Sequence, residues 1–400
     1  MGEIIPPSSI LGSHAPRLQT LPPLSLYIHL PWCVKKCPYC DFNSHEARSG
    51  NMPEDDYVAA LIHDLETALP QIWGRKVVSV FFGGGTPSLF SARSIDALLT
   101  AVRTLLPLEH LAEVTLEANP GTVEAQKFAD FRAAGINRLS LGIQSFNSRH
   151  LQALGRIHDG DEARRAVEIA QKNFDNVNLD LMYALPNNAT EQTLDEARQD
   201  ITTAMSYGVP HISVYHLTLE PNTLFHRYPP PLPDDDLAAE MQVMIEQTLA
   251  DNGYTNYETS AFAQPGRESR HNLNYWLFGD YLGIGAGAHG KLSFADRVTR
   301  HERMKQPREY MAASGELQPR AVGAKELPFE FMLNALRLVE GFPAELLSRR
   351  TGLPQIAFES GLREAEARGF VTRELKMIRP TEQGRRFLND LVGLFLPAQE

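Results

Sequence analysis

The sequence has few cysteines, only three among 400 residues, and three thiols cannot form the disulfide framework of a small secreted protein. It also lacks any run of about 18 uncharged apolar residues, so we expect no transmembrane helix. Residues 1–22 carry an early acid and many prolines but no continuous apolar block, which is not the pattern of a secretory signal. We therefore expect a disordered leader at 1–22 and a cytoplasmic location.

Positive charge is scarce as well. The chain has 38 Lys and Arg against 49 Asp and Glu, a net charge of −11. Extended binding to a phosphate backbone needs basic residues that replace counterions, so we expect no nucleic-acid partner. The apolar fraction of 43% is that of an ordinary globular protein, and the length allows more than one domain.

Six short runs rich in β-branched or aromatic residues predict buried strands, with helical patterns between them. The predicted strands are Leu24–Leu30, Lys76–Phe82, Glu113–Asn119, Arg138–Gln144, Asn176–Met182 and His211–Leu217. The helical patterns are Asp55–Leu69, Ser91–Leu106, Thr122–Ala134, Asp161–Asn173 and Thr190–Tyr207. Strands that alternate with helices predict a parallel sheet with right-handed crossovers. The pattern alone fits both a partial barrel and a doubly wound sheet.

Polar and glycine-rich residues follow these strands. All three cysteines come after the first strand, Gly83–Pro87 ("GGGTP") follows the second, and Glu117, Gln144 and Asp180 lie in or at the end of the next three. The C-terminal ends of parallel strands meet at one rim, where α/β folds carry their chemistry. The sequence therefore predicts a single site assembled at this rim.

The rest of the chain predicts a different organisation. Arg227–Asp236 ("RYPPPLPDDD") is typical of a linker or rigid loop, and a helical pattern covers Asp235–Asp251. From about Arg320 the pattern is mostly helical, with a short strand hairpin before the last helix, as in a winged-helix-like domain. We expect a core domain at 23–235, a connecting and barrel-completing region at 236–319, and a C-terminal module at 320–400.

The cysteines are spaced CxxxCxxC, at Cys33, Cys37 and Cys40. Three thiolates on one loop can hold three irons of a [4Fe–4S] cluster and leave the fourth iron open for a ligand. Two alternatives stay open from the residues alone: a zinc site completed by a distant histidine, and three incidental cysteines.

This spacing, with Tyr39 before the last cysteine, resembles the radical S-adenosylmethionine (SAM) superfamily. The resemblance implies a partial (β/α)6 TIM-like barrel, with SAM bound at the open iron. It also implies that an electron from the cluster cleaves SAM to a 5′-deoxyadenosyl radical. In that superfamily a glycine run after the second strand binds the methionine amine, and Gly83–Pro87 stands at that place.

Six stretches resemble, more narrowly, the oxygen-independent coproporphyrinogen dehydrogenase (HemN-like) family: "YIHLPWC", "FFGGGTPS", "EANP", "SLGIQSFN", "LGRIH" and "NLDLMYALP". The C-terminal module resembles that family's own. The resemblance implies a first SAM site at Tyr27, Gly84 and Glu117. It implies a second SAM site at Tyr39, Gly85, Thr86, Gln144, Arg156 and Asp180. For the acidic residues a helix cap or surface position is the alternative, and for Arg156 a solvated charge at a helix start.

Two departures favour a sister branch of that family, the heme chaperones (HemW). Phe42 stands where the decarboxylating enzymes are expected to have a further cysteine, and "HNLNYW" is similar to the HNxxYW motif of the chaperones. The resemblance implies heme ligation by His271, with Tyr275 and Trp276 offering flat apolar surface. The alternative is a core cluster of a histidine and aromatic side chains.

For two further histidines the sequence leaves two alternative roles open. His29 lies two residues after Tyr27 on the same strand face, so it either tunes the cluster from behind its ligands or packs inside the barrel. His289, in "GAGAHG", is either a heme ligand or part of a glycine-rich turn. We expect His211 and His216 to be ordinary sheet residues.

The resemblance implies a cytosolic heme chaperone that binds a [4Fe–4S] cluster, SAM and heme and lacks coproporphyrinogen dehydrogenase activity. Its partners would be heme-acceptor proteins such as membrane respiratory subunits, and an electron donor such as flavodoxin or ferredoxin. The alternative is the enzyme itself, which decarboxylates the propionates of coproporphyrinogen III in porphyrin metabolism. An RNA-modifying radical enzyme is disfavoured by the acidic charge.

Overall fold

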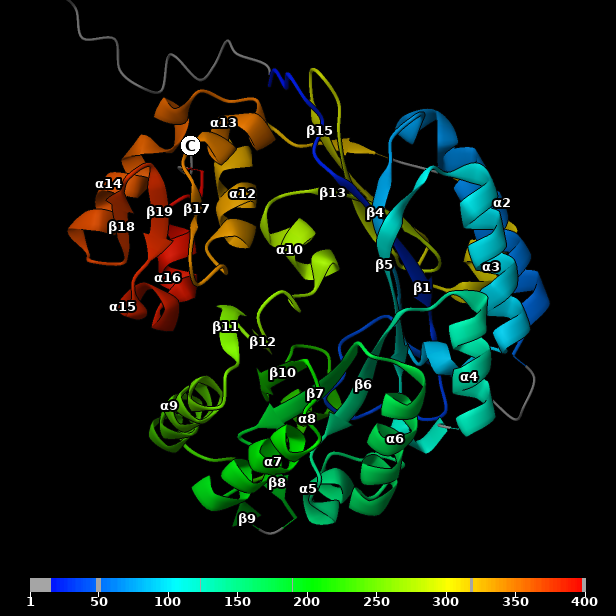
Figure 1. The fold of residues 1–400 in the computed structure, drawn as a ribbon. Helices are drawn as coiled ribbons and strands as arrows, with labels where there is room; N and C mark the ends of the chain where they lie inside the picture. Colours follow the sequence, from blue (N-terminus) through cyan, green and yellow to red (C-terminus); the bar gives the residue numbers. More distant parts are fainter. Residues whose placement is uncertain (1–15, 48–51, 123, 189, 317–318, 398–400) are drawn as a thin grey trace, which may run out of the picture.

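A 12-stranded open sheet forms the centre of the molecule (Figure 1). The structure is a computed structural model that describes residues 16–47, 52–122, 124–188, 190–316 and 319–397. All six predicted strands form, and they lie side by side in parallel in the order of the chain. They are β1 (Leu24–Leu30), β4 (Val77–Gly84), β5 (Leu108–Ala118), β6 (Arg138–Gln144), β7 (Val177–Tyr183) and β10 (His211–His216).

Helices connect these strands and cover the outer face of the sheet (Figure 1). The connecting helices are α2 (Glu54–Ile72), α3 (Ala92–Leu105), α4 (Ala125–Ala134), α6 (Gly160–Asn173) and α7 (Leu194–Ser206), and α9 (Asp235–Asp251) follows β10. Two of them begin at a capping box, Asp159 with Glu162 in α6 and Thr193 with Glu196 in α7. Their apolar faces bury the main core against the sheet.

The two edges of the sheet are antiparallel and do not meet. Beyond β10 lie β12 (Ala261–Ala263) and β11 (Thr255–Glu258). Beyond β1 lie β13 (Asp280–Ile284), which is parallel to β1, then β14 (His289–Ser293), β15 (Val298–Glu302) and β16 (Arg320–Ala321). The expected partial TIM-like barrel is confirmed, and its sheet is open.

A short helix, α10 (Arg270–Trp276), carries most of the "HNLNYW" stretch and fills the inside of the sheet near the N-terminal strand ends. The carboxylate of Glu113, in the middle of β5, accepts hydrogen bonds from the Ser269 hydroxyl and from the backbone N–H groups of Arg270 and His271. The backbone N–H groups in the first turn of a helix have no acceptor within the helix, and the Glu113 carboxylate supplies one here. Glu113 therefore fixes α10 as a plug at this end of the barrel.

The C-terminal part has its own core. Its helices are α12 (Leu327–Ala335), α13 (Glu345–Thr351), α14 (Glu359–Ala367), α15 (Glu382–Arg386) and α16 (Leu388–Gly393), and its three-stranded sheet has the order β17 (Phe342–Pro343), β19 (Met377–Pro380), β18 (Val371–Glu374). The expected hairpin is β18–β19. Figure 1 shows α10 between this part and the large sheet. The remaining short strands and α-helices are β2 (Trp32–Cys33), β3 (His45–Glu46), α5 (Ser148–Ala153), β8 (Pro186–Asn187), β9 (Thr190–Glu191), α8 (Leu224–Arg227) and α11 (Pro307–Ala312).

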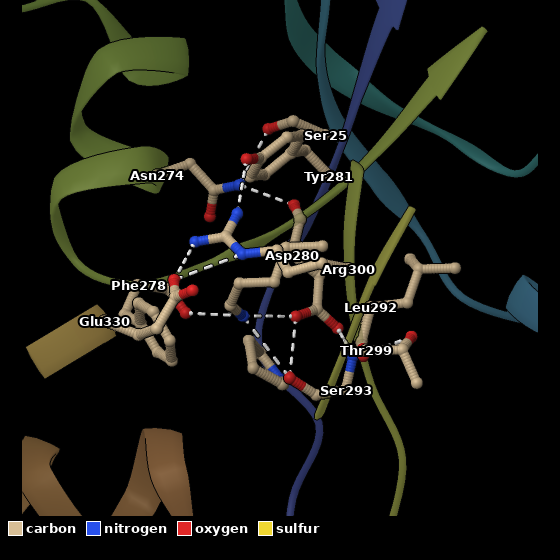
Figure 2. A network of polar contacts seen from close by, with 12 residues as sticks. Ser25, Asn274, Phe278, Asp280, Tyr281, Leu292, Ser293, Thr299, Arg300 and Glu330 are labelled. Atoms are coloured by element: carbon tan, nitrogen blue, oxygen red, sulfur yellow. Dashed lines mark hydrogen bonds and ion pairs between the residues drawn. The ribbon is translucent and has the colours of Figure 1, made fainter. Parts of the chain in front are cut away.

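A buried network ties α10, the edge strands and the C-terminal part together (Figure 2). Lys291 Nζ lies 2.7 Å from Asp280 Oδ1, and both side chains are about fully buried. The ammonium also donates to the Phe278 carbonyl at 3.1 Å and lies 4.2 Å from the centre of the Phe278 ring. Next to it, Arg300 of β15 pairs with Glu330 of α12. The network thereby holds the turn that follows α10.

The predicted disordered leader falls mostly on residues 1–15, which lie outside the described residues. For Arg17 and Leu18 the prediction is wrong. Arg17 N–H donates to the Gly352 carbonyl at 3.1 Å, and the Leu18 side chain is 7% exposed in the C-terminal core. Within the described ranges, no helix is both long enough and apolar enough to cross a membrane.

Candidate functional site

A cavity of about 560 Å³ opens at the C-terminal ends of the parallel strands. Most of the residues predicted for the site line it: Cys33, Cys37, Tyr39, Cys40, Gly84, Gly85, Thr86, Glu117, Gln144, Arg156 and Asp180. Its size is in the range that takes small-molecule ligands. Tyr27 and His271 are not among the lining residues.

The three cysteines lie on the loop that leaves β1, and none forms a disulfide. Burial raises the pKa of the Cys33 and Cys40 thiols, so both favour the neutral form until a metal or cation stabilises the thiolate. Among the described residues, no three or more His, Cys, Asp or Glu side chains are grouped closely enough to hold a single metal ion. In a cluster each thiolate binds a different iron, so this spacing fits a [4Fe–4S] cluster better than a zinc ion.

The loop after the cysteines is held by the segments that follow β13 and β15. Asn43 Nδ2 donates to the carbonyls of Ala286 and Lys305, each at 2.8 Å. The Asn43 carbonyl lies 2.9 Å from His29 Nε2, and His29 Nδ1 lies 3.0 Å from the Tyr27 hydroxyl. His29 is 5% exposed, so it packs inside the barrel and supports the cysteine loop from behind.

Two glycines let the end of β4 approach the cysteine loop. Gly84 has φ +115, and a Cβ there would lie 2.6 Å from the His29 ring. A Cβ on Gly85 would lie 2.5 Å from the Trp32 carbonyl oxygen. Gly84 N–H donates to Glu117 Oε2 at 3.2 Å. A side chain at either position would collide with these groups, so both positions require glycine.

Glu117 and Asp180 face the cavity from β5 and β7. Burial, followed by repulsion from Asp180, raises the pKa of Glu117 to about 8, and burial raises that of Asp180. Asp180 accepts hydrogen bonds from Ser140 Oγ and Asn178 Nδ2, both at 2.8 Å. Neither carboxyl has an ion-pair partner in the part of the chain that is described. Such groups can bind a ligand ammonium or ribose hydroxyls.

Arg156 reaches the cluster loop from the segment after α5. Its Nη1 donates to Cys37 Sγ at 3.5 Å and its Nη2 to the Gly142 carbonyl at 2.8 Å. The alternative that Arg156 is a solvated charge at a helix start is therefore wrong. Gln144, at the end of β6, adopts φ +67 at a register irregularity between β6 and β7. Backbone strain of this kind is found where a site fixes a side chain.

His271 lies apart from this cavity, inside the plug. It is 2% exposed, with its ring 4.5 Å from that of Phe81 and 4.4 Å from that of Tyr275. Burial lowers its pKa to about 3. In this conformation it belongs to a buried cluster of a histidine and aromatic rings. His289 is exposed and lies 3.6 Å from Glu302, away from the cavity lining.

Several residues at the site were not predicted from the sequence. Asn178 and Ser140 hold Asp180, and Asn178 was detectable because it lies two positions before Asp180 on one strand face. His211 and His216 both lie in β10, as expected; His211 is buried, and His216 also lines the cavity. Arg337 reaches the cavity from the C-terminal part, and no local pattern indicates that.

Comparison with known proteins shows the family of the chain. Residues 27–200 match the Radical SAM superfamily and residues 322–387 the HemN C-terminal domain. The chain is 49% identical over 378 residues to the heme chaperone HemW of Escherichia coli, covering 94% of this chain and 99% of that protein. The chain belongs to the HemW family. The HemW of Bacillus subtilis is 33% identical over 381 residues, 93% of this chain and 99% of that protein.

The fold is also that of a solved relative outside the HemW family. The coproporphyrinogen III oxidase HemN of Escherichia coli superposes with a TM-score of 0.78 at 22% identity, over 99% of this chain and 93% of that one. This likeness concerns the fold. At the position of the expected further cysteine, this chain has Phe42, which lines the cavity and is 62% exposed.

Proposed function

We propose that this protein is a radical SAM heme chaperone: it holds a [4Fe–4S] cluster on Cys33, Cys37 and Cys40, binds SAM in the cavity, and binds and delivers heme. One observation carries the proposal: a single cavity is lined by the cysteine loop, by the glycines at the end of β4, and by the carboxyls of Glu117 and Asp180. Its membership in the HemW family supports the heme part.

The residues of the cavity have separate tasks. The three thiolates would hold three irons, and a reduced cluster with SAM on the fourth iron supplies the electron that cleaves SAM. Gly84 offers backbone to the methionine end of SAM, while Glu117 accepts bonds from its ammonium or ribose. Arg156 is placed to neutralise negative charge on the loop, since its guanidinium already donates to Cys37.

A second SAM site on Tyr39, Gly85, Thr86, Gln144, Arg156 and Asp180 is part of the proposal, because these residues line the same cavity. Heme ligation by His271 is also part of it. That ligation requires α10 to leave the barrel, since the His271 side chain is 2% exposed where it lies. We propose heme-acceptor proteins such as respiratory cytochromes, an electron donor such as flavodoxin or ferredoxin, and a cytoplasmic location.

The test is anaerobic reconstitution of the full chain followed by two measurements. Wild type should hold about four irons per chain, and Cys→Ser at any of the three positions should remove most of them. A heme titration run beside an anaerobic coproporphyrinogen assay then separates the chaperone from the enzyme. Heme binding without porphyrinogen conversion is the expected result. Conversion of coproporphyrinogen, or full iron content in a cysteine variant, would overturn the proposal.

A further inference from the structure

A small hollow adjoins the cavity at the cysteine loop. Its volume is about 10 Å³, which is room for about one water molecule. Cys37 lines both the hollow and the cavity, whereas Cys33 and Cys40 line the cavity alone. The hollow is therefore too small for an organic cofactor, but it marks a place where Cys37 lies close to the exposed side chains that border it.

Two exposed aliphatic side chains border this hollow. Val34, within the cysteine loop, is 50% exposed, and Ile157 is 40% exposed. A Cβ on Gly155 would lie 2.9 Å from Pro38 Cδ, so the segment that carries Ile157 packs directly against the cysteine loop. An exposed apolar pair beside a redox site suits a partner whose redox group has an apolar edge, such as the dimethylbenzene ring of a flavin.

The charge at the hollow is opposite in sign to that of the whole chain. Its lining contains two basic side chains, Lys35 and Arg156, and no acidic one, although the net charge of the chain is −11. Lys35 is exposed, and within the described ranges it has no hydrogen bond or ion pair. An unpaired surface ammonium attracts an acidic protein and speeds the encounter with it. Electron-transfer complexes are small and transient, so a few side chains of this kind make up a large share of one.

From these observations we infer that the surface formed by Val34, Lys35 and Ile157 docks a small acidic flavin-bearing electron carrier, of the flavodoxin kind, which reduces the cluster beside Cys37. The inference rests on the proposed function and names the place of its electron donor. The donor loses one electron and the cluster gains it, without proton transfer or a new covalent bond. The glycines of β4 and both carboxyls line the cavity and not the hollow, so a docked donor leaves SAM in place.

The test uses the reconstituted full chain and a flavodoxin, with two readouts. Calorimetry with oxidised flavodoxin measures docking without electron transfer, and anaerobic stopped-flow absorbance with reduced flavodoxin measures cluster reduction. Lys35→Glu at low salt should weaken the affinity and slow the reduction, each about tenfold, because it turns attraction into repulsion. Ile157→Asp should do the same by removing an apolar contact. The matched control is Lys76→Glu, the same change of charge on an exposed lysine directly before β4, and it should alter neither.

The outcomes separate this inference from the function on which it rests. Equal affinity and equal reduction rate in Lys35→Glu and wild type would overturn the docking surface, and so would a loss that Lys76→Glu shares. A loss seen with a ferredoxin and not with flavodoxin would overturn the flavin-bearing partner. Raising the ionic strength should narrow the difference between Lys35→Glu and wild type, because salt screens the attraction.

Two controls complete the experiment. Dithionite is a small inorganic reductant that needs no docking surface, so it should reduce the cluster in every variant. A variant that dithionite also fails to reduce, at an iron content equal to that of wild type, would contradict a docking role. A wild-type chain that holds no cluster would overturn both the inference and the proposed function.

Discussion

Glu113→Gln is the sharpest test of the plug at the N-terminal end of the barrel. Glu113 is 7% exposed and receives three hydrogen bonds from the start of α10, and its Oε2 lies 3.9 Å from the guanidinium of Arg138. Glutamine keeps the shape of the side chain. Its amide NH₂ group, however, would face an N–H donor at the place where one carboxylate oxygen of Glu113 accepts a hydrogen bond. The change also removes the negative charge beside a buried cation.

The magnitude follows from the partners that remain. Removing one member of a buried charge pair costs about 3 to 5 kcal/mol. Arg138 keeps its attraction to Asp180, since its charge lowers the pKa of that carboxyl against the larger effect of burial. We therefore expect the low end, a loss of about 3 kcal/mol in the free energy of unfolding of the barrel.

The assay is urea unfolding of the full chain, followed by tryptophan fluorescence, together with hydrogen exchange of the amides of Arg270 and His271. Exchange at these two amides should speed up in Glu113→Gln, because their acceptor is weakened. Ser269→Ala, which removes only the neutral capping hydroxyl, should cost about 1 kcal/mol. A Glu113→Gln stability within about 0.5 kcal/mol of wild type, with unchanged exchange, would refute the argument.

Three further changes test other parts of the structure. Gly84→Ala should abolish SAM binding in equilibrium dialysis, because its Cβ meets a histidine ring at 2.6 Å; Gly74→Ala, also at positive φ but with nothing within 4 Å, should leave binding intact. Burial raises the pKa of Asp200 to about 6, so its stabilising contribution is complete below its unfolded pKa and is lost as pH rises through about 6. Asp200→Asn should therefore gain about 3 kcal/mol relative to wild type between about pH 4 and pH 8 in urea unfolding, and a pH-independent difference would contradict this. Lys291→Met should lower the free energy of unfolding by about 3 kcal/mol in the same assay, because it leaves the buried carboxylate of Asp280 with fewer partners. Lys305→Met, which removes one member of an exposed ion pair, should change it by less than about 0.5 kcal/mol, and equal effects of the two changes would be contrary evidence.

The sequence predicted the parts of the fold that local pattern controls. Strands such as Arg138–Gln144 and the helix Asp235–Asp251 have the predicted bounds. In each, the apolar residues follow one periodicity, and the residues at both ends are typical of the start and the end of such an element. The cavity residues at strand ends were also predicted, since parallel strands bring their C-terminal ends to one rim.

Contacts between distant segments were not predictable in the same way. The pairing of Leu24 with Asp280 joins β1 to β13, and nothing in either run specifies the other as partner. The burial of His271 depends on Glu113, which lies 158 residues away along the chain. Arg337 enters the cavity only through the packing of two cores. These features follow from tertiary packing, which a periodic pattern does not encode.

The bonds from Asn43 to Ala286 and Lys305 have a consequence for the order of biosynthesis. Asn43 and Ala286 are 243 residues apart, which a ribosome translates in about 12 to 50 s. During that interval β1 lacks its neighbour β13, and the loop of Cys33, Cys37 and Cys40 has no anchor on that side. A nascent chain therefore presents three unprotected thiols before it presents a finished cavity, so we expect the proposed iron–sulfur cluster to be loaded at the end of translation or after it.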